Sequence, residues 1–302
     1  MGGIREILAG IDARSQSGLD KLYETFRSIP DYELPIVRRT LAPGESLIRQ
    51  RVNPKGVTFT QVSQLSYPPA SRTSYGRVNI PGNPMFYACT FPSRVSDKAP
   101  IPRVVALEET SAFMRDKSSS GIERATVSRW DVVASIDLIA LPFIGPYTRS
   151  CPDLLVTRDG WKDAISKGIV PKMALDLVVF MAEEIAKAAE NELEYAKIAH
   201  FVYYLLRINL KTKDADGIIY PSVPAQGAGF NVALKPESVD AKIRFSNASE
   251  CHLLKNKDKA FVIPMKDAKL DEYGNISFRD RVLSPQEWES YDEYSEGLTF
   301  VN

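Results

Sequence analysis

The chain has 302 residues, of which 38 are basic and 38 acidic, so its formal net charge at pH 7 is zero. This balance excludes the sequence-wide basic field that drives non-specific binding to nucleic acids or anionic membranes. A hydrophobic content of 44% and a charged content of 25% are typical of a folded globular protein and exclude a disordered one.

The first 44 residues predict a helical extension. Apolar side chains recur at helical spacing over residues 4–11 and again over 19–26, which is typical of two short amphipathic helices. The next segment, residues 45–52, alternates apolar and charged side chains and indicates a strand. Residues 53–83 are rich in Pro, Ser and Gly and predict a long loop.

The middle of the chain mixes strands and helices. Residues 85–91 predict a buried strand, 104–115 a helix, and 130–144, rich in β-branched residues, one or two strands. Helical signals dominate residues 159–210, where Ala, Glu and Lys are abundant. Further strands are predicted over residues 217–223, 230–234, 241–245 and 260–265. This order lacks regular strand–helix–strand alternation, so it predicts an α+β fold with a helical insertion.

The remaining segments bear on the location of the protein. Residues 271–302 carry several acids and aromatics and predict a peripheral tail. The most apolar stretches, residues 132–144 and 173–181, contain Asp137 or Asp176 and are shorter than the about 18 apolar residues that a membrane span needs. The N-terminus lacks the charged-then-apolar order of a signal peptide. We therefore expect a soluble, cytoplasmic protein with no membrane partner.

The cysteines and histidines limit the possible chemistry. Cys89, Cys151 and Cys251 are widely spaced and form no CxxC pair, so we interpret them as buried thiols rather than metal ligands or disulfides. Two histidines, His200 and His252, are too few for a histidine-rich metal centre and leave little room for a catalytic triad. The sequence therefore predicts no metal site.

A loop punctuated by Gly and Pro places an arginine ahead of a strand that carries a tyrosine. The loop reads Tyr75-Gly76-Arg77-Val78-Asn79-Ile80-Pro81-Gly82-Asn83-Pro84-Met85-Phe86-Tyr87. A loop of this kind can hold a guanidinium fork in place for bidentate binding of phosphate. The alternative is a surface turn with a solvated Arg77.

Three further sequence features could contribute to a binding or catalytic site. Ser222 ends a predicted strand before a Gly-rich loop that leads to Asn231. With no histidine nearby in the sequence, a hydrogen-bonding role fits Ser222 better than a nucleophilic one. Glu108 and Glu109 are neighbours on a predicted helix and point about 100° apart, so they cannot form a metal pair by themselves. The Gly227-Ala228-Gly229 sequence lacks the third glycine of a dinucleotide fingerprint and predicts a turn between strands.

Four separated blocks of the chain, in order, resemble the RES family, which takes its name from an arginine, a glutamate and a serine. The blocks are Leu47-Ile48-Arg49-Gln50-Arg51, Gly76-Arg77-Val78-Asn79 with Pro81-Gly82 and Tyr87, Ala106-Leu107-Glu108-Glu109-Thr110, and Tyr220-Pro221-Ser222-Val223 with Asn231. The resemblance implies an ADP-ribosyltransferase-like mixed β core. The catalytic domain would then span residues 45–270, with its helical insertion at 159–210, between the helical extension at 1–44 and the tail at 271–302.

The resemblance also implies the site residues. Arg49, Glu109 and Ser222 are expected to be catalytic, with Arg51 and Glu108 as alternatives for the first two. The residues expected to bind NAD are Arg51, Arg77, Tyr75, Tyr87 and Asn231. In these roles the arginines neutralise the pyrophosphate, and the glutamate stabilises a cationic ribose or orients the acceptor. A tyrosine stacks on nicotinamide, and the serine and asparagine hydrogen-bond the ribose or the carboxamide.

The implied function is that of a toxin from a toxin–antitoxin pair. Such an enzyme degrades NAD by hydrolysis or phosphorolysis of the nicotinamide–ribose bond, without a metal, and its expected partner is an Xre-type helix-turn-helix antitoxin. Residues 159–210 are then scaffold, or a docking surface for the antitoxin or a second subunit. The alternatives are a protein ADP-ribosyltransferase on the same scaffold and a non-enzymatic partner-binding module. Direct nucleic-acid binding is the weakest option, since no basic run stands out.

Overall fold

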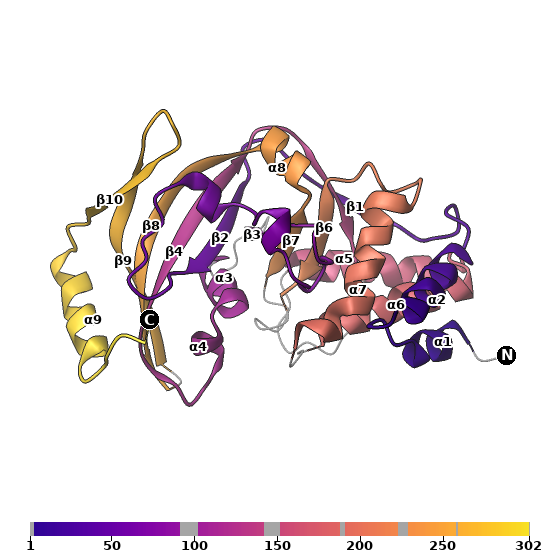
Figure 1. The fold of residues 1–302 in the computed structure, drawn as a ribbon, viewed down its shortest axis with the longest axis horizontal. Helices are drawn as coiled ribbons and strands as arrows, with labels where there is room; N and C mark the ends of the chain where they lie inside the picture. Colours follow the sequence, from indigo (N-terminus) through magenta and orange to yellow (C-terminus); the bar gives the residue numbers. More distant parts are fainter. Residues whose placement is uncertain are drawn as a thin grey trace.

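A mixed sheet forms the centre of the protein, and most helices gather at one end of it (Figure 1). The computed structural model describes residues 3–90, 102–141, 152–187, 191–222, 229–257 and 259–301. Within these residues, the sheet has the strand order β1-β5-β6-β7-β3-β2-β4-β8-β9-β10. The strands are β1 (Val37–Leu41), β2 (Ser46–Val52), β3 (Phe86–Thr90), β4 (Ser120–Val132), β5 (Ile136–Ala140), β6 (Gly217–Pro221), β7 (Phe230–Leu234), β8 (Ile243–Asn256), β9 (Lys259–Leu270) and β10 (Ile276–Asp280).

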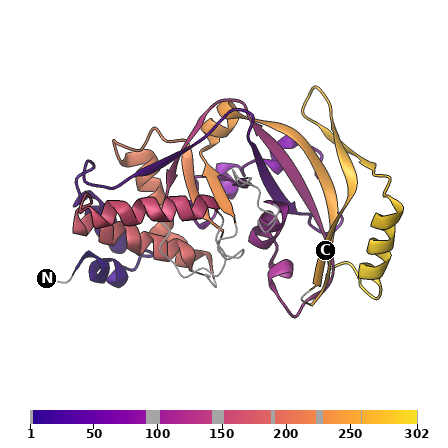
Figure 2. The same cartoon turned by 180° about the vertical axis from the view of Figure 1, so that it is seen from behind.

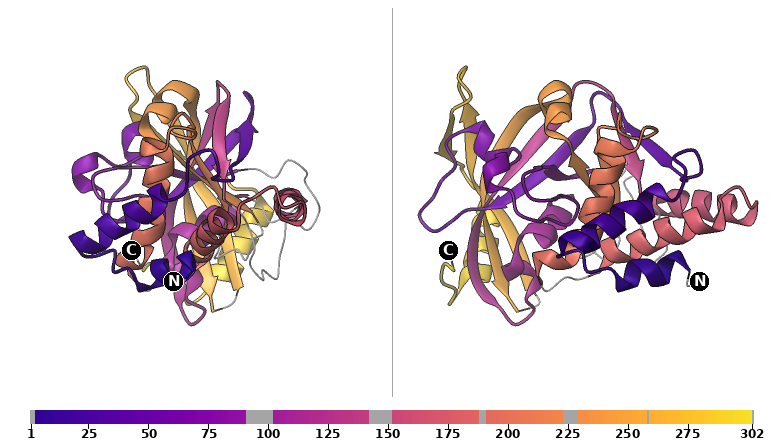
Figure 3. Two further views of the ribbon diagram at one scale, coloured as in Figure 1. Left: turned by 90° about the vertical axis from the view of Figure 1, so that its right-hand side faces the viewer. Right: turned by 45° about the vertical axis from the view of Figure 1, so that its right-hand side comes forward.

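The helices are distributed unevenly around this sheet. They are α1 (Ile4–Gly10), α2 (Gln16–Arg27), α3 (Pro102–Thr110), α4 (Ala112–Arg115), α5 (Pro152–Ser166), α6 (Lys172–Ala186), α7 (Ala196–Tyr203), α8 (Pro236–Lys242) and α9 (Pro285–Ser295), with 3-10 turns η1 (Val62–Leu65), η2 (Ala70–Arg72) and η3 (Glu192–Tyr195) and a π-helical turn η4 (Tyr204–Ile208). Turned views show α1, α2, α5, α6 and α7 at one end and α9 at the other (Figures 2 and 3). We call the first group, together with η4, the helical lobe.

Strand directions explain why the chain from α5 to η4 lies between β5 and β6. Within the described residues, neighbouring strands pair antiparallel, except β5 and β6, which run parallel. A parallel pair needs a long crossover connection, and the chain from α5 to η4 lies between these two strands. The large mixed sheet with many helices confirms the predicted α+β class. The ADP-ribosyltransferase-like fold stays a prediction.

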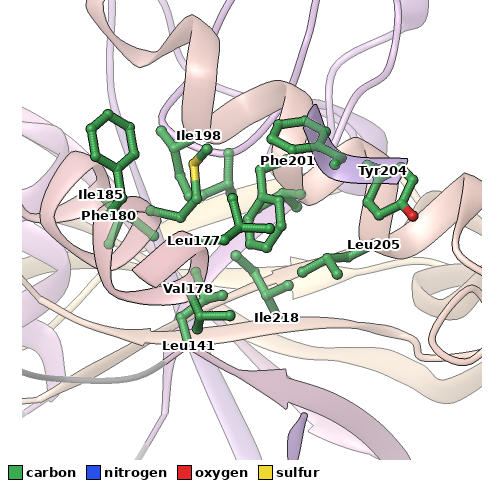
Figure 4. Close-up of a cluster of buried hydrophobic side chains, with 14 of the residues drawn as sticks. Leu141, Leu177, Val178, Phe180, Ile185, Ile198, Phe201, Tyr204, Leu205 and Ile218 are labelled. Atoms are coloured by element: carbon green, nitrogen blue, oxygen red, sulfur yellow. The ribbon is translucent and has the colours of Figure 1, made fainter. Parts of the chain in front are cut away.

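The helical lobe and the sheet share one buried cluster. Figure 4 shows Leu177 of α6, Phe201 of α7 and Ile218 of β6 within it. Phe26 of α2 belongs to the same cluster, with its ring centroid 5.3 Å from that of Phe201. Leu8 of α1 is fully buried there as well. Because α1 and α2 contribute to this core, they belong to the main folded body rather than to a separate appendage.

The first 44 residues also contain a strand that the sequence pattern did not predict. β1 pairs antiparallel with β5, with Val37 opposite Ala140 and Leu41 opposite Ile136. Of its five residues, Leu41 is buried, while Arg38 donates a hydrogen bond to Asp137 of β5. One fully buried apolar residue in so short a segment gives too little alternation to be recognised in the sequence.

Another difference lies at the start of β8. Residues 241–245, predicted as a strand, span the end of α8 and the beginning of β8. Pro236 at the first helical position starts α8, a placement that proline favours because it has no N–H to leave unpaired. Further along β8, Glu250 is 1% exposed and accepts a hydrogen bond from Arg124 at 2.8 Å. A buried carboxylate that is paired with a partly exposed arginine interrupts the apolar pattern by which β4 and β8 could be recognised in the sequence.

The C-terminal residues add regular structure to the edge of the sheet. β10 pairs with β9, and α9 packs beside β8 and β9. Tyr294 of α9 stacks on Phe261 of β9 with ring centroids 5.1 Å apart. Tyr291 places its hydroxyl 3.1 Å from Nδ1 of His252 in β8. The segment expected to be a tail therefore covers one end of the β4–β8–β9 sheet.

The prediction of buried thiols is confirmed for Cys89 and Cys251, which are buried cysteine thiols. Cys151 lies outside the described residues. Among the helices described, none has the length and apolar character needed to cross a bilayer.

Gly217 begins β6 where a neighbouring strand comes close. A Cβ atom there would lie 2.1 Å from the backbone oxygen of Ala233. That oxygen belongs to the backbone of β7 and is fixed in the sheet. We therefore expect Gly217→Ala to lower the free energy of unfolding by about 1–3 kcal/mol, the usual cost of overpacking. Gly160 of α5 is the control, since a Cβ there meets nothing within 4 Å. Gly160→Ala should raise stability by about 0.5–1 kcal/mol. Denaturant unfolding of both variants measures this, and an undiminished Gly217→Ala midpoint would contradict the packing.

The lowered pKa of His252 predicts that the protein loses stability on mild acidification. Burial lowers the pKa of His252 from 6.5 to about 4. Between these values the unfolded chain takes up a proton that the native ring does not bind, so the contribution of this group is constant above pH 6.5 and the free energy of unfolding falls as the pH decreases toward 4. Thermal midpoints of the wild type and His252→Gln, measured from pH 7 to 5, should converge or cross as the pH falls. Parallel curves would show that His252 does not titrate in this way.

Candidate active site

The candidate site lies on the face of the sheet that α3 covers, called here the α3 face. Ile48 of β2 is opposite Cys89 of β3, and Cys89 is opposite Asn231 of β7. Residues that are directly opposite on paired strands point to the same side of a sheet. Ile48 and Cys89 pack with Leu107 of α3 in one buried cluster. Cys89 and Asn231 therefore lie next to each other on the α3 face.

Glu109, in the last turn of α3, is held by two side chains from the sheet. Its Oε1 accepts a hydrogen bond from Ser222 Oγ at 2.6 Å and another from Asn231 Nδ2 at 2.7 Å. Ser222 directly follows β6 and is buried, while Asn231 is 4% exposed within β7. Glu109 itself keeps partial exposure. Charge-assisted hydrogen bonds are short and strong, so the two donors fix the carboxylate in position.

Gly229 allows α3 to approach the sheet this closely. A Cβ atom on Gly229 would lie 2.9 Å from the side chain of Val105, which is four residues before Glu109 and so on the same side of α3. The carbonyl of Gly229 also accepts a hydrogen bond from the backbone N–H of Ser222 at 2.8 Å. The glycine predicted to form a turn thus also makes room for α3.

Two protonated groups lie beside the carboxylate. Cys89 Sγ donates a hydrogen bond to Asn231 Oδ1 at 3.1 Å. Burial, with a smaller contribution from the charge of Glu109, raises the pKa of the Cys89 thiol well above its usual value. Tyr220 of β6 pairs with Asn231, and burial followed by the charge of Glu109 raises its pKa as well. Both groups therefore stay protonated at neutral pH.

Tyr87 fixes the loop that the sequence singled out. Its hydroxyl donates to Asn79 Oδ1 at 2.7 Å and accepts from the backbone N–H of Val78 at 3.2 Å. The N–H of Gly76 donates to the carbonyl of Asn79 at 3.0 Å and closes the turn. A Cβ on Gly76 would lie 2.3 Å from Asn79 Oδ1, so a side chain at this position would displace the Asn79 amide. The polar end of Tyr87 is thus used inside the protein, and the residue as a whole is half-buried.

Arg77 links this loop to the helical lobe. Its Nη1 donates to the carbonyls of Ile185 at 2.6 Å and Lys187 at 3.1 Å, at the C-terminal end of α6. The guanidinium also lies over the ring of Tyr195, 4.6 Å from its centroid. A cation at a helix C-terminus is favourable because the exposed carbonyls carry partial negative charge. Arg77 therefore has a structural role whether or not it binds phosphate.

Tyr75 is anchored by a histidine of the helical lobe. His200 of α7 places Nε2 3.0 Å from the Tyr75 hydroxyl and Nδ1 2.9 Å from the hydroxyl of Tyr23 in α2. Burial lowers the pKa of His200, which favours the neutral ring with one donor and one acceptor nitrogen. The three side chains join α2, α7 and the loop.

Arg49 lies on the sheet face opposite to α3. Its guanidinium lies 5.2 Å from the ring centroid of Phe86, and it donates to the carbonyls of Leu65 at 3.0 Å and Tyr87 at 2.6 Å. Burial and the neighbouring charge of Arg51 lower the pKa of Arg49 to about 10. The contacts of Arg49 therefore hold η1 against β3, on the side of the sheet away from Glu109.

Arg51 shares that opposite face. Its guanidinium donates to the carbonyl of Gln64 and lies 5.3 Å from the ring centroid of Phe59. The structure thus joins Glu109, Ser222 and Asn231 directly, and it does not bring either β2 arginine to them.

Sequence reasoning missed two residues of the α3 face. Cys89 was interpreted only as a buried thiol, and no motif marks it as a partner of Asn231. Gln50 lies between Arg49 and Arg51 and therefore faces the α3 side, where it is opposite Val127. It is 2% exposed, and neither of its amide heteroatoms has a hydrogen-bond partner within the described residues. A glutamine at an inward position of a strand is the signal that could have found it.

The side chain of Glu108 lies outside the described part of the chain, so the structure describes only Glu109 of the two. Across the residues that the structure describes, no group of three or more His, Cys, Asp or Glu side chains could hold a metal ion. No model of a known protein family matches the chain, and no match was found among curated protein sequences. The resemblance to the RES family therefore rests on its sequence blocks and stays a prediction.

The contact between Asn231 and Glu109 can be tested by replacing the NH2 group of Asn231 with an oxygen atom. In Asn231→Asp a second carboxylate replaces the donor 2.7 Å from Glu109 Oε1. Two carboxylates in direct contact repel each other, and a hydrogen bond is lost, so we expect the free energy of unfolding at pH 7 to fall by about 2 kcal/mol or more. The exposed Asn247→Asp is the matched control and should change stability by less than about 0.5 kcal/mol. Equal effects in denaturant unfolding would mean that Asn231 does not contact a charged carboxylate.

Proposed function

We propose that the protein cleaves the nicotinamide–ribose bond of NAD and that Glu109 is the carboxylate that stabilises the transition state. The observation that carries this proposal is the contact of Ser222 and Asn231 with Glu109 Oε1. These residues are 113 and 122 positions away from Glu109 in the chain. They belong to the blocks of the sequence that resemble the RES family, and packing brings them to one oxygen atom.

The geometry suits this reaction. Loss of nicotinamide leaves positive charge on the ribose, as in glycoside hydrolysis, where carboxylates stabilise an oxocarbenium-like transition state. A carboxylate that is already fixed by its surroundings stabilises such charge without reorganising during the reaction. Ser222 and Asn231 both use Oε1. We therefore assign Oε2 of Glu109 as the oxygen that faces the ribose.

The same arrangement favours a hydrogen-bonding role for Ser222. Its hydroxyl proton is engaged with Glu109 at 2.6 Å, and the side chain is fully buried. In the proposal Ser222 orients the carboxylate and forms no covalent intermediate.

The arginines divide into two roles in this proposal. Arg77 is partly exposed, and its charge lowers the pKa of Tyr87 and Tyr220 against the larger effect of burial. Arg77 is therefore the cation that supports pyrophosphate binding near the α3 face. Arg49 supports the site indirectly through its bond to the Tyr87 carbonyl. An Xre-type antitoxin and a toxin role in the cytoplasm accompany this proposal as expectations of the family resemblance.

Release of free nicotinamide from NAD is the direct test. Wild-type protein is incubated with NAD, with and without phosphate, and nicotinamide is followed by chromatography. Glu109→Gln keeps the shape of the side chain but removes its charge, so the initial rate should fall by about 100-fold or more. Glu108→Gln is the matched variant and should keep most of the rate.

The outcomes separate the alternatives. Activity that is lost in Glu108→Gln and kept in Glu109→Gln would move the assignment to Glu108. NAD labelled in the adenylate part, added to cell lysate, reports transfer to protein and so distinguishes a protein ADP-ribosyltransferase. Failure of the wild type to release nicotinamide under all these conditions would overturn the proposed function.

A further inference from the structure

We propose that Cys89 is a positioning residue that fixes the side-chain amide of Asn231 so that its NH2 group faces Glu109. In relation to catalysis this inference rests on the proposed function, but the contact itself can be tested without turnover.

The hydrogen bonds form a chain with one direction. An ionised carboxylate only accepts hydrogen bonds, so the amide of Asn231 must present Nδ2 to Glu109 Oε1, as observed at 2.7 Å. Its Oδ1 then points the other way, where it needs a donor. Cys89 Sγ lies 3.1 Å from this oxygen and supplies the proton. The order thiol, amide, carboxylate is thus the one arrangement that gives each acceptor a donor.

Strand pairing places the thiol where the amide needs it. Cys89 and Asn231 are directly opposite each other on the antiparallel strands β3 and β7. Their exposed fractions are 3% and 4%, so water has little access to replace the thiol. Burial keeps the thiol protonated, since it raises the pKa of Cys89. Hydrogen bonds in such a chain polarise one another, so the donor at one end strengthens the bond at the other.

Removal of the thiol has a defined consequence. Asn231 Oδ1 becomes a buried acceptor without a donor, and the amide loses the contact that holds it on the side away from Glu109. Glu109 then keeps its hydrogen bond from Ser222, but the hydrogen bond from Asn231 is weakened. We therefore expect Cys89→Ala to lower kcat for NAD about 10-fold, the equivalent of one hydrogen bond to a charged group, with KM changed by less than about 2-fold.

Cys251 provides a matched control. Its side chain is 2% exposed and packs in the same cluster as Cys89, but its thiol donates to the backbone carbonyl of Ser249 at 3.7 Å. Cys251→Ala should therefore lower the thermal midpoint about as much as Cys89→Ala and leave kcat unchanged. Cys89→Ser keeps a donor at the same position and should restore most of kcat. Equal kcat losses in Cys89→Ala and Cys251→Ala, or no rescue by Cys89→Ser, would reduce Cys89 to a packing residue.

Side-chain amide NMR tests the contact independently of NAD. The NH2 resonances of Asn231 are assigned by their loss in Asn231→Asp. We expect them to shift and exchange faster with solvent in Cys89→Ala, to return toward their wild-type positions in Cys89→Ser, and to stay unchanged in Cys251→Ala. Unchanged resonances in Cys89→Ala would overturn this inference. A shift in a protein that does not release nicotinamide would leave the Cys89 contact standing while the proposed function fails.

Discussion

The site depends on one constraint: the Glu109 carboxylate of α3 must accept hydrogen bonds from side chains of the sheet. Ser222 at the end of β6 and Asn231 in β7 provide them. This works only because α3 comes close to β7, which the missing side chain of Gly229 permits. The hydrogen bonds of Glu109, Ser222 and Asn231 therefore join a helix and two strand regions that are distant in sequence. The position of each element depends on the others.

The sheet also separates Glu109 from the two arginines of β2. Glu109 lies on the α3 face with Cys89 and Asn231, while Arg49 and Arg51 bind backbone carbonyls and aromatic rings on the opposite face. Direct pairing of an arginine with Glu109 would neutralise the carboxylate. In the reaction that we propose, the separation keeps that negative charge available to a cationic transition state. The β2 arginines instead stabilise the strands on which the site is built.

The helical lobe restrains the loop that lies beside this site. Arg77 caps α6, and Tyr75 contacts His200, which in turn contacts Tyr23 of α2. The N-terminal helices are therefore connected to the loop through side chains, although they are far from Glu109 in the chain. A loop that is held by such contacts has less conformational entropy to lose when it binds a ligand.

The sequence by itself determined the α+β class and most of the strands near the site, and its blocks marked Glu109, Ser222 and Asn231, because apolar periodicity and local motifs are readable without tertiary contacts. It also determined that Arg49 and Arg51 share one face of β2 and Gln50 the other, since side chains alternate along a strand. Only the tertiary structure decided which of these faces α3 covers. That choice follows from the packing of Ile48, Cys89 and Leu107 in one cluster, which depends on strand order and not on any local pattern. The partnership of Cys89 with Asn231 has the same origin, because it requires β3 and β7 to be neighbours.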